Sequence, residues 1–136
     1  MKEAKEIYKD DIGNDISWFC ITDYQPMLEE FGNILIQVDD DDYSGDSRVL
    51  YEKSGKYGFL IFGWGSCSGC DALQAAKNIN KIQELMDDLQ NEIMWFSSID
   101  DLKKYFIEKD WELEYCWHIK NTKEFINKVI NYDSIN

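Results

Sequence analysis

The chain is poor in proline, histidine and positive charge. It has one proline and one histidine in 136 residues, and its 14 Lys and Arg residues stand against 27 Asp and Glu, which leaves a net charge of −13. Because nucleic-acid phosphates repel such a surface, the composition argues against direct binding of DNA or RNA. A basic protein partner fits this charge, and so does the simpler interpretation that the excess only maintains solubility.

Long hydrophobic runs are also missing. No stretch approaches the roughly 20 apolar residues that a membrane-spanning helix needs, and the first residues, MKEAKEIYKDD, lack the apolar core of a secretory signal. We therefore expect a cytoplasmic protein without membrane contact. Hydrophobic residues at 44% and aromatic residues at 15% are sufficient for one folded domain over residues 1–136.

Hydrophobic periodicity predicts an α+β fold, with an antiparallel sheet of about four or five strands flanked by about three or four helices. Two of the strands form a hairpin that turns at Ser54-Gly55. The predicted strands are Ile34–Val38, Ser47–Lys53, Lys56–Gly63, Ile93–Phe96 and Trp111–His118. The predicted helices are a short one over Gln25–Phe31, a long one over Asp71–Gln90, one over Ile99–Glu108 capped by Ser98, and a last one from Asn121 or Thr122 to about Tyr132.

The cysteines are the main candidates for chemistry. They are Cys20, Cys67, Cys70 and Cys116. Without an export signal, metal binding or thiol chemistry is favoured over structural disulfides. Cys67 and Cys70 lie in a glycine-rich turn, between an apolar run with strand composition and the start of the long helical pattern. Such a corner suits thiolates.

The spacing of Cys67 and Cys70, with a glycine between them, is that of a zinc knuckle, in which both thiolates face one ion. Cys116 and His118 are two residues apart in a predicted strand and therefore point to the same face. These four side chains predict a closed, structural Zn²⁺ site at the strand-to-helix corner. Cys20 or Asp71 is an alternative for either distal ligand.

Three other interpretations of this stretch stay open. A Cys-x-x-Cys pair before a helix is also typical of a thioredoxin-like thiol oxidoreductase, although here no proline follows the pair and a hairpin precedes it. Gly63, Gly65 and Gly69 form a loose relative of the dinucleotide-binding fingerprint, with spacing that is off by one. In the simplest interpretation, the cysteines are ordinary buried residues around a glycine turn.

Acidic residues are the candidates for binding a partner. The run from Asp39 to Asp42 partly matches a calcium loop, but the required glutamate is one residue late, so we expect a solvated loop. No hydrolase motif is present in the sequence, so hydrolase chemistry has no support. The partner-binding candidates are Asp39, Asp40, Asp41, Asp42, Asp46, Asp87 and Asp88, and each is explained as well by a solvated face.

The stretch Gly65-Ser66-Cys67-Ser68-Gly69-Cys70-Asp71-Ala72-Leu73 resembles one found in small acidic proteins encoded by phages and prophages. The resemblance covers Asp46–Leu89 and the region Tyr115–His118. Small acidic phage proteins include zinc-bearing anti-CRISPR proteins, which inhibit the type II CRISPR nuclease. The resemblance implies a non-enzymatic inhibitor that binds this basic nucleoprotein and blocks DNA loading. An immunity protein for a basic toxin fits the charge equally well.

Overall fold

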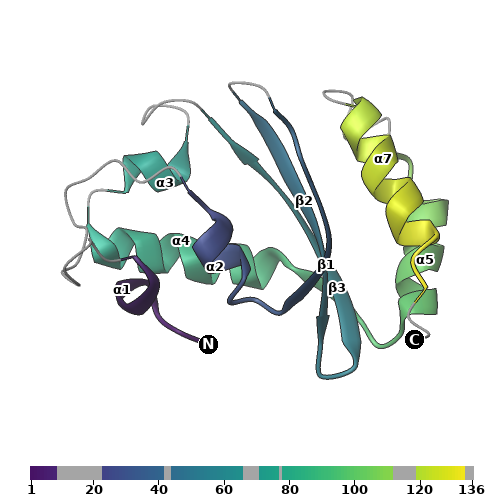
Figure 1. Ribbon diagram of the computed structural model, residues 1–136, viewed down its shortest axis with the longest axis horizontal. Helices are drawn as coiled ribbons and strands as arrows, with labels where there is room; N and C mark the ends of the chain where they lie inside the picture. The colour runs from purple at the N-terminus through teal and green to yellow at the C-terminus, as the bar shows by residue number, and fades with distance from the viewer. Residues whose placement is uncertain (9–22, 42–43, 66–70, 77, 112–118, 134–136) are drawn as a thin grey trace.

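The computed structural model describes residues 1–8, 23–41, 44–65, 71–76, 78–111 and 119–133. In them, four strands form an antiparallel sheet in the order β1-β2-β3-β4. Figure 1 shows the sheet between two groups of helices. The strands are β1 (Asn33–Asp39), β2 (Gly45–Lys53), β3 (Lys56–Trp64) and β4 (Met94–Phe96). The helices are α1 (Ala4–Ile7), α2 (Gln25–Leu28), α3 (Ala72–Ala75), α4 (Ile79–Glu92), α5 (Ile99–Glu108) and α7 (Ile119–Ile130). The predicted α+β class is confirmed.

The centre of the sheet is the β2–β3 hairpin. Its register runs from Gly45 opposite Trp64 to Lys53 opposite Lys56, which leaves a two-residue turn. Both turn residues have left-handed backbone conformation, with φ of 53° at Ser54 and 80° at Gly55. Two such residues in succession make the turn whose twist matches that of the flanking strands. The predicted hairpin is confirmed.

Side chains of β2 alternate between the two faces of the sheet. Val49 and Tyr51 join the core under α1–α4, whereas Leu50 joins the core under α5 and α7. This alternation follows from the pleat of a strand. The two helical groups lie on opposite sides of the sheet in Figure 1 and cover separate hydrophobic clusters.

Aromatic rings fill the core beneath α5 and α7. The Phe106 ring centroid lies 4.8 Å from those of both Phe59 and Trp111, and 5.8 Å from that of Phe125. These tilted and edge-on arrangements are the favourable ones for aromatic pairs. All four side chains are buried. This face of the sheet is therefore closed by close-packed rings.

One predicted helix proved to be two. The structure has α3 and α4 in place of the single helix predicted over Asp71–Gln90. Asn78 begins the second helix, because its side chain accepts a hydrogen bond from the backbone N–H of Lys81 at 3.0 Å. An asparagine in this role satisfies an N–H that would otherwise lack a partner, and so favours a helix start. The hydrophobic period runs through this break and does not reveal it.

The predicted strand Trp111–His118 is wrong at its first residue, since Trp111 is helical. Its indole N–H donates to the carbonyl of Phe106 on α5, at 2.8 Å, and this contact keeps the ring in the core. Residues 112–118 lie outside the described residues. The last helix begins at Ile119, two residues before the predicted start.

The remaining predicted elements are confirmed, with small shifts of their ends. Strand β1 covers the predicted strand, and β4 begins at Met94, one residue after the predicted start. Helix α5 spans the predicted Ile99–Glu108, with the Ser98 hydroxyl accepting from the N–H of Asp101 at 3.1 Å. The short helix α2 ends three residues before the predicted Phe31. In the part of the chain that the structure describes, no helix is both long and apolar enough to cross a membrane.

Candidate functional site

A pocket of about 450 Å³ opens at one end of the sheet, on the face that carries α1–α4. The residues just before and within α2 form one side, the end of β1 and the start of β2 form another, and the end of β3 and Asp71 complete it. Four lining residues carry carboxylates, namely Asp23, Asp39, Asp40 and Asp71. The lining is therefore strongly acidic.

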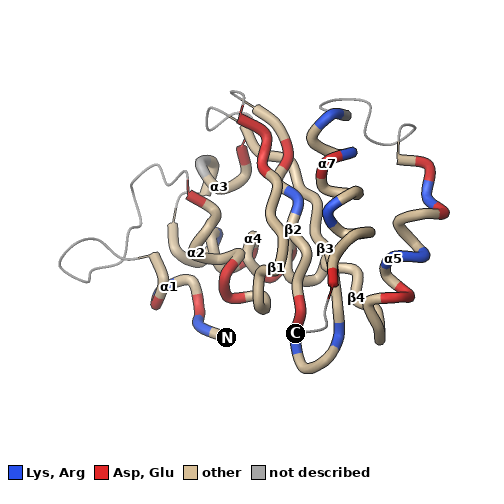
Figure 2. The backbone as a smooth tube through the Cα atoms, turned by 45° about the vertical axis from the view of Figure 1, so that its right-hand side comes forward, with Lys and Arg blue, Asp and Glu red and all other residues tan. Residues whose placement is uncertain are grey.

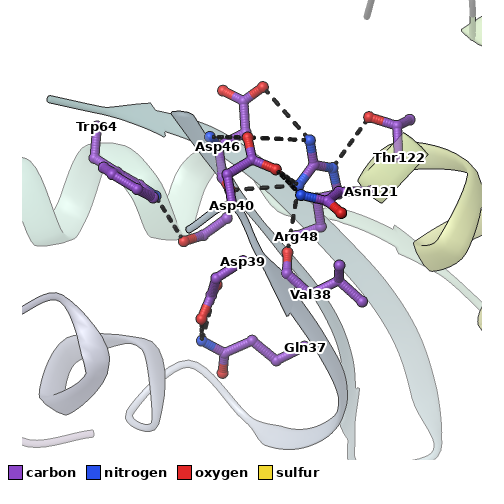
Figure 3. A network of polar contacts seen from close by, with 10 residues as sticks. Gln37, Val38, Asp39, Asp40, Asp46, Arg48, Trp64, Asn121 and Thr122 are labelled. Carbon is purple, nitrogen blue, oxygen red and sulfur yellow. Dashed lines mark hydrogen bonds and ion pairs between the residues drawn. The ribbon is translucent and has the colours of Figure 1, made fainter. Parts of the chain in front are cut away.

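The apolar wall of the pocket is made by Tyr24, Leu28 and Trp64. The indole N–H of Trp64 donates to the Ser47 hydroxyl at 2.9 Å, which fixes the ring on β3 (Figure 3). The Tyr24 ring packs against that of Phe62, with centroids 4.9 Å apart. Both rings are thus held in place by the sheet beneath them.

Two glutamine side chains join α2 to β1 at the pocket. The Gln25 amide donates to the Gln37 carbonyl oxygen at 2.9 Å, and the Gln37 amide donates back at 2.7 Å. Gln37 Nε2 also lies 3.0 and 3.2 Å from the two oxygens of Asp39. Figure 3 shows this amide beside the carboxylate. The exposed Asp39 carboxylate is therefore oriented at the rim.

Asp71 is buried and bonded to Tyr24. The Tyr24 hydroxyl donates to Asp71 Oδ1 at 2.5 Å and accepts from the backbone N–H of Leu73 at 3.2 Å. Burial raises the pKa of Tyr24 well above its ordinary value, and the hydrogen bond to Asp71 raises it further. The phenol therefore stays protonated and continues to donate. Asp71 follows Cys70 directly in the sequence, and this bond holds the Asp71 side chain against Tyr24.

The prediction of a fully solvated acidic loop is wrong at Asp40. Its side chain is buried, and Arg48 Nη1 and Asn121 Nδ2 donate to Oδ1 at 2.8 and 2.7 Å. The backbone N–H of Asp46 donates to Oδ2 at 2.8 Å, and Arg48 Nε donates to the Thr122 hydroxyl at 3.2 Å (Figure 3). The loop is not solvated here because the strand pairing turns this carboxylate toward a buried guanidinium.

The environment of Asp40 decides its charge. Burial alone would raise the pKa of the carboxyl, but the hydrogen bonds from Arg48, Asn121 and the N–H of Asp46 outweigh burial and hold the pKa below its ordinary value. Asp40 is therefore ionised at neutral pH and its oxygens are occupied by intramolecular donors. It is a structural residue of the pocket wall and not a surface contact for a partner.

The other predicted partner-binding residues divide into two places. Asp39 and Asp41 are exposed and Asp46 is half-buried. They belong to the end of β1, the residues just after it and the start of β2, and Figure 2 shows acidic residues in red at this end of the two strands. Asp87 and Asp88 are exposed on α4, where Asp87 accepts a hydrogen bond from Gln83 at 2.9 Å. Asp42 lies outside the described residues.

The predicted zinc ligands Cys67, Cys70, Cys116 and His118 lie outside the described residues, as does Cys20. Among the described residues, no group of three His, Cys, Asp or Glu side chains is placed to hold a metal ion. The zinc site therefore stays a prediction.

The described residues that flank the two ligand segments lie at the same end of the sheet. Trp64, next to the first segment, pairs with Gly45 in the hairpin register. Asn121, close after the second segment, donates to Asp40 in the connection between β1 and β2.

Sequence reasoning missed most of the pocket. Asp23, Tyr24 and the Gln25–Gln37 pair come together only when α2 packs over β1, and no spacing in the sequence signals this contact. Trp64 had a recognisable signal, because an aromatic residue directly before a glycine-rich turn is placed at the end of a strand.

The chain matches no protein-family model, no curated protein and no solved structure. The chemistry of the pocket and of the surface around it is therefore the basis for a functional assignment.

Proposed function

We propose that the chain is a non-enzymatic binding protein whose acidic sheet end holds a basic protein partner. The supporting observation is the lining of the pocket, in which four of the described residues are aspartates and none is Lys or Arg. The net charge of −13 extends the same negative potential over the whole chain. Such a potential steers a basic partner during encounter and suppresses acidic ones.

The pocket chemistry favours binding over acid–base catalysis. Asp40 is held ionised by Arg48, and a carboxylate with a lowered pKa is a poor general acid or base at neutral pH. Asp71 already accepts a hydrogen bond from a Tyr24 hydroxyl whose pKa is raised. These two buried groups hold the pocket wall in place, and the exposed Asp23 and Asp39 present negative charge to a partner.

The sequence resemblance supplies a more specific form of the proposal. In it, the protein is a phage-encoded inhibitor in the cytoplasm of the host cell, and it binds a type II CRISPR nuclease in the basic channel that normally holds nucleic acid. An acidic surface with an acidic pocket could compete with nucleic acid for such a channel.

Affinity capture from a host lysate with the full chain tests the general proposal. We expect a basic protein to be retained at low salt, and to be lost when Asp23, Asp39 and Asp41 are all changed to Asn. The matched control changes three exposed acids on α4 and α5, as Glu92→Gln, Asp100→Asn and Glu108→Gln, and should retain the partner. Equal capture by the two triple variants, or no basic partner, contradicts the proposal.

Purified type II CRISPR nuclease tests the specific form. We expect the chain to bind the guide-loaded nuclease and to reduce its loading onto target DNA, with a strong dependence on salt because the contact is electrostatic. Capture of a basic toxin in place of a nuclease would assign the chain to the immunity proteins.

Elemental analysis and chelation test the predicted zinc. We expect one Zn²⁺ per chain, and a melting temperature lowered by EDTA and by Cys67→Ser but much less by Cys20→Ser, because a structural metal contributes to the folding free energy. A metal-free protein with an unchanged melt contradicts the site. Reduction of insulin by the metal-free chain would favour the thiol oxidoreductase.

A further inference from the structure

We infer that the pocket binds one arginine side chain of the partner, with its guanidinium between the Trp64 ring and the Asp39 carboxylate. The inference rests on the proposed function and names the group that the pocket recognises. A site for an arginine side chain needs a cavity of the right size, a wall on which the planar guanidinium can stack, and acceptors that match the guanidinium donors.

The size of the cavity favours an organic occupant over a bare ion. Its volume of about 450 Å³ lies within the range of pockets that hold small molecules or side chains. The described lining residues include no set of three side chains placed to hold a metal ion. The pocket also opens to solvent at the rim formed by the exposed Asp23 and Asp39, where a side chain from a partner can enter.

Trp64 provides the stacking wall. Its N–H is directed to the Ser47 hydroxyl, so the part of the indole that is left for an occupant is the ring. The side chain is half-buried, which limits its movement and leaves some of the ring accessible. A guanidinium is planar and weakly hydrated, and it stacks on tryptophan more favourably than an ammonium does.

The acceptors come from two different elements. Asp39, at the end of β1, has its carboxylate oriented by Gln37, and Asp23, before α2, accepts from the backbone N–H of Gln25 at 3.0 Å. A guanidinium has five N–H donors in a fixed planar fork and can bind carboxylates on more than one side, whereas an ammonium is a compact charge. Asp71 also lines the pocket, and its side chain is buried.

NMR titration of the full chain tests the inference, with the indole N–H signal of Trp64 as the reporter. The probes are acetyl-Gly-Arg-Gly-amide, the same peptide with lysine, and the same peptide with citrulline, the neutral isostere of arginine. The Trp64→Phe variant assigns the signal among those of the five tryptophans. Asp39→Asn tests the acceptor, and Asp100→Asn on α5 removes the same charge from the opposite face of the sheet.

We expect the arginine peptide to shift the Trp64 signal, the lysine peptide to bind more weakly and the citrulline peptide not to bind. Asp39→Asn should weaken the arginine peptide about tenfold, the value of one charge-assisted hydrogen bond, and Asp100→Asn should leave it unchanged. Equal binding of arginine and lysine with equal effects of the two variants overturns the inference, as does the absence of any shift at about 10 mM peptide.

The outcomes for the two proposals are separable. If a basic partner is captured and the arginine peptide does not bind, the inference about the pocket is wrong and the proposed function stands. If the peptide binds with the expected dependence on Asp39 and no basic partner is captured, the ligand class of the pocket stands and the proposed function is wrong.

Discussion

Helices α5 and α7 close one face of the sheet with aromatic rings and a buried ion pair, whereas α1–α4 leave a pocket at the end of the other face. Neighbouring residues of β2 contribute to both: Arg48 points toward α7, and Ser47 lines the pocket. Acidic side chains therefore have two different roles in this protein. The buried Asp40 carboxylate accepts hydrogen bonds from Arg48 and from Asn121 of α7, and so holds this helix against the sheet. The neighbouring carboxylates of Asp39 and Asp41 are exposed.

Loss of the buried ion pair is expected to have the largest effect. Asp40→Ala leaves the buried Arg48 guanidinium with the Asp46 carboxylate at 3.9 Å in place of the Asp40 contact at 2.8 Å, and should lower the free energy of unfolding by about 3–5 kcal/mol. The neighbouring Asp39→Ala, on the exposed rim, should change it by less than about 0.5 kcal/mol. Urea denaturation measures both values. Similar losses of unfolding free energy for the two variants would contradict the distinction between the paired Asp40 and the exposed Asp39.

The same pair predicts a dependence on pH. Because the folded protein lowers the pKa of Asp40, the stabilisation is fully present above the ordinary value of 3.8 and is lost as the pH falls through the folded-state pKa. The difference in stability between the wild type and Asp40→Asn should therefore be large at pH 7 and should shrink on acidification below about pH 4. A difference that is constant from pH 7 to strongly acidic solution contradicts the charged pairing.

Loss of the Tyr24–Asp71 hydrogen bond on the pocket side should lower the free energy of unfolding by a smaller amount. Tyr24→Phe removes a hydroxyl donor to the buried Asp71 side chain and should cost about 1–3 kcal/mol in unfolding free energy. Tyr51→Phe removes a donor to the neutral carbonyl of Leu28, 2.7 Å away, and should cost about 0.5–1.5 kcal/mol. Thermal and urea unfolding rank the two variants, and a larger loss for Tyr51→Phe would contradict the expected order.

A smaller effect is expected where the α1–α4 face is tightly packed. A Cβ added at Gly58 would lie 2.6 Å from Trp95 Cε3 and 2.9 Å from Ile93 Cγ2, so Gly58→Ala should cost about 1–3 kcal/mol through overpacking. Gly63 on the same strand is the matched control, because its added Cβ would come no closer than 3.3 Å, to Asp46 Oδ1. Equal stability of the two variants would mean that Trp95 repacks freely.

The sheet was predictable from the sequence because its strands pair locally. The hairpin and its turn follow from alternating residues and from Ser54-Gly55, which needs no distant information. Helix α5 was equally predictable, since Ser98 is a cap whose partner is three residues away. The break between α3 and α4 was not, because the apolar positions continue through it.

The role of Asp40 was not predictable from the sequence. Within a run of four aspartates it has the same local pattern as its exposed neighbours, and only its pairing with Arg48 and Asn121, 81 residues away, distinguishes it. The pocket was hidden for the same reason, because residues from Asp23 to Asp71 meet there through packing. The zinc prediction depends on residues outside those that the structure describes.

The meander order of the strands sets the order in which the molecule can be assembled. Each strand pairs with the strand that precedes or follows it in sequence, so β1, β2 and β3 can pair before the C-terminal helix leaves the ribosome. Helix α7 is different, because Asn121 and Thr122 must return to β1 and β2 over more than half of the chain. Docking of this helix therefore depends on contacts across a large sequence separation, and Thr122 reaches Arg48 only once the helix is in place.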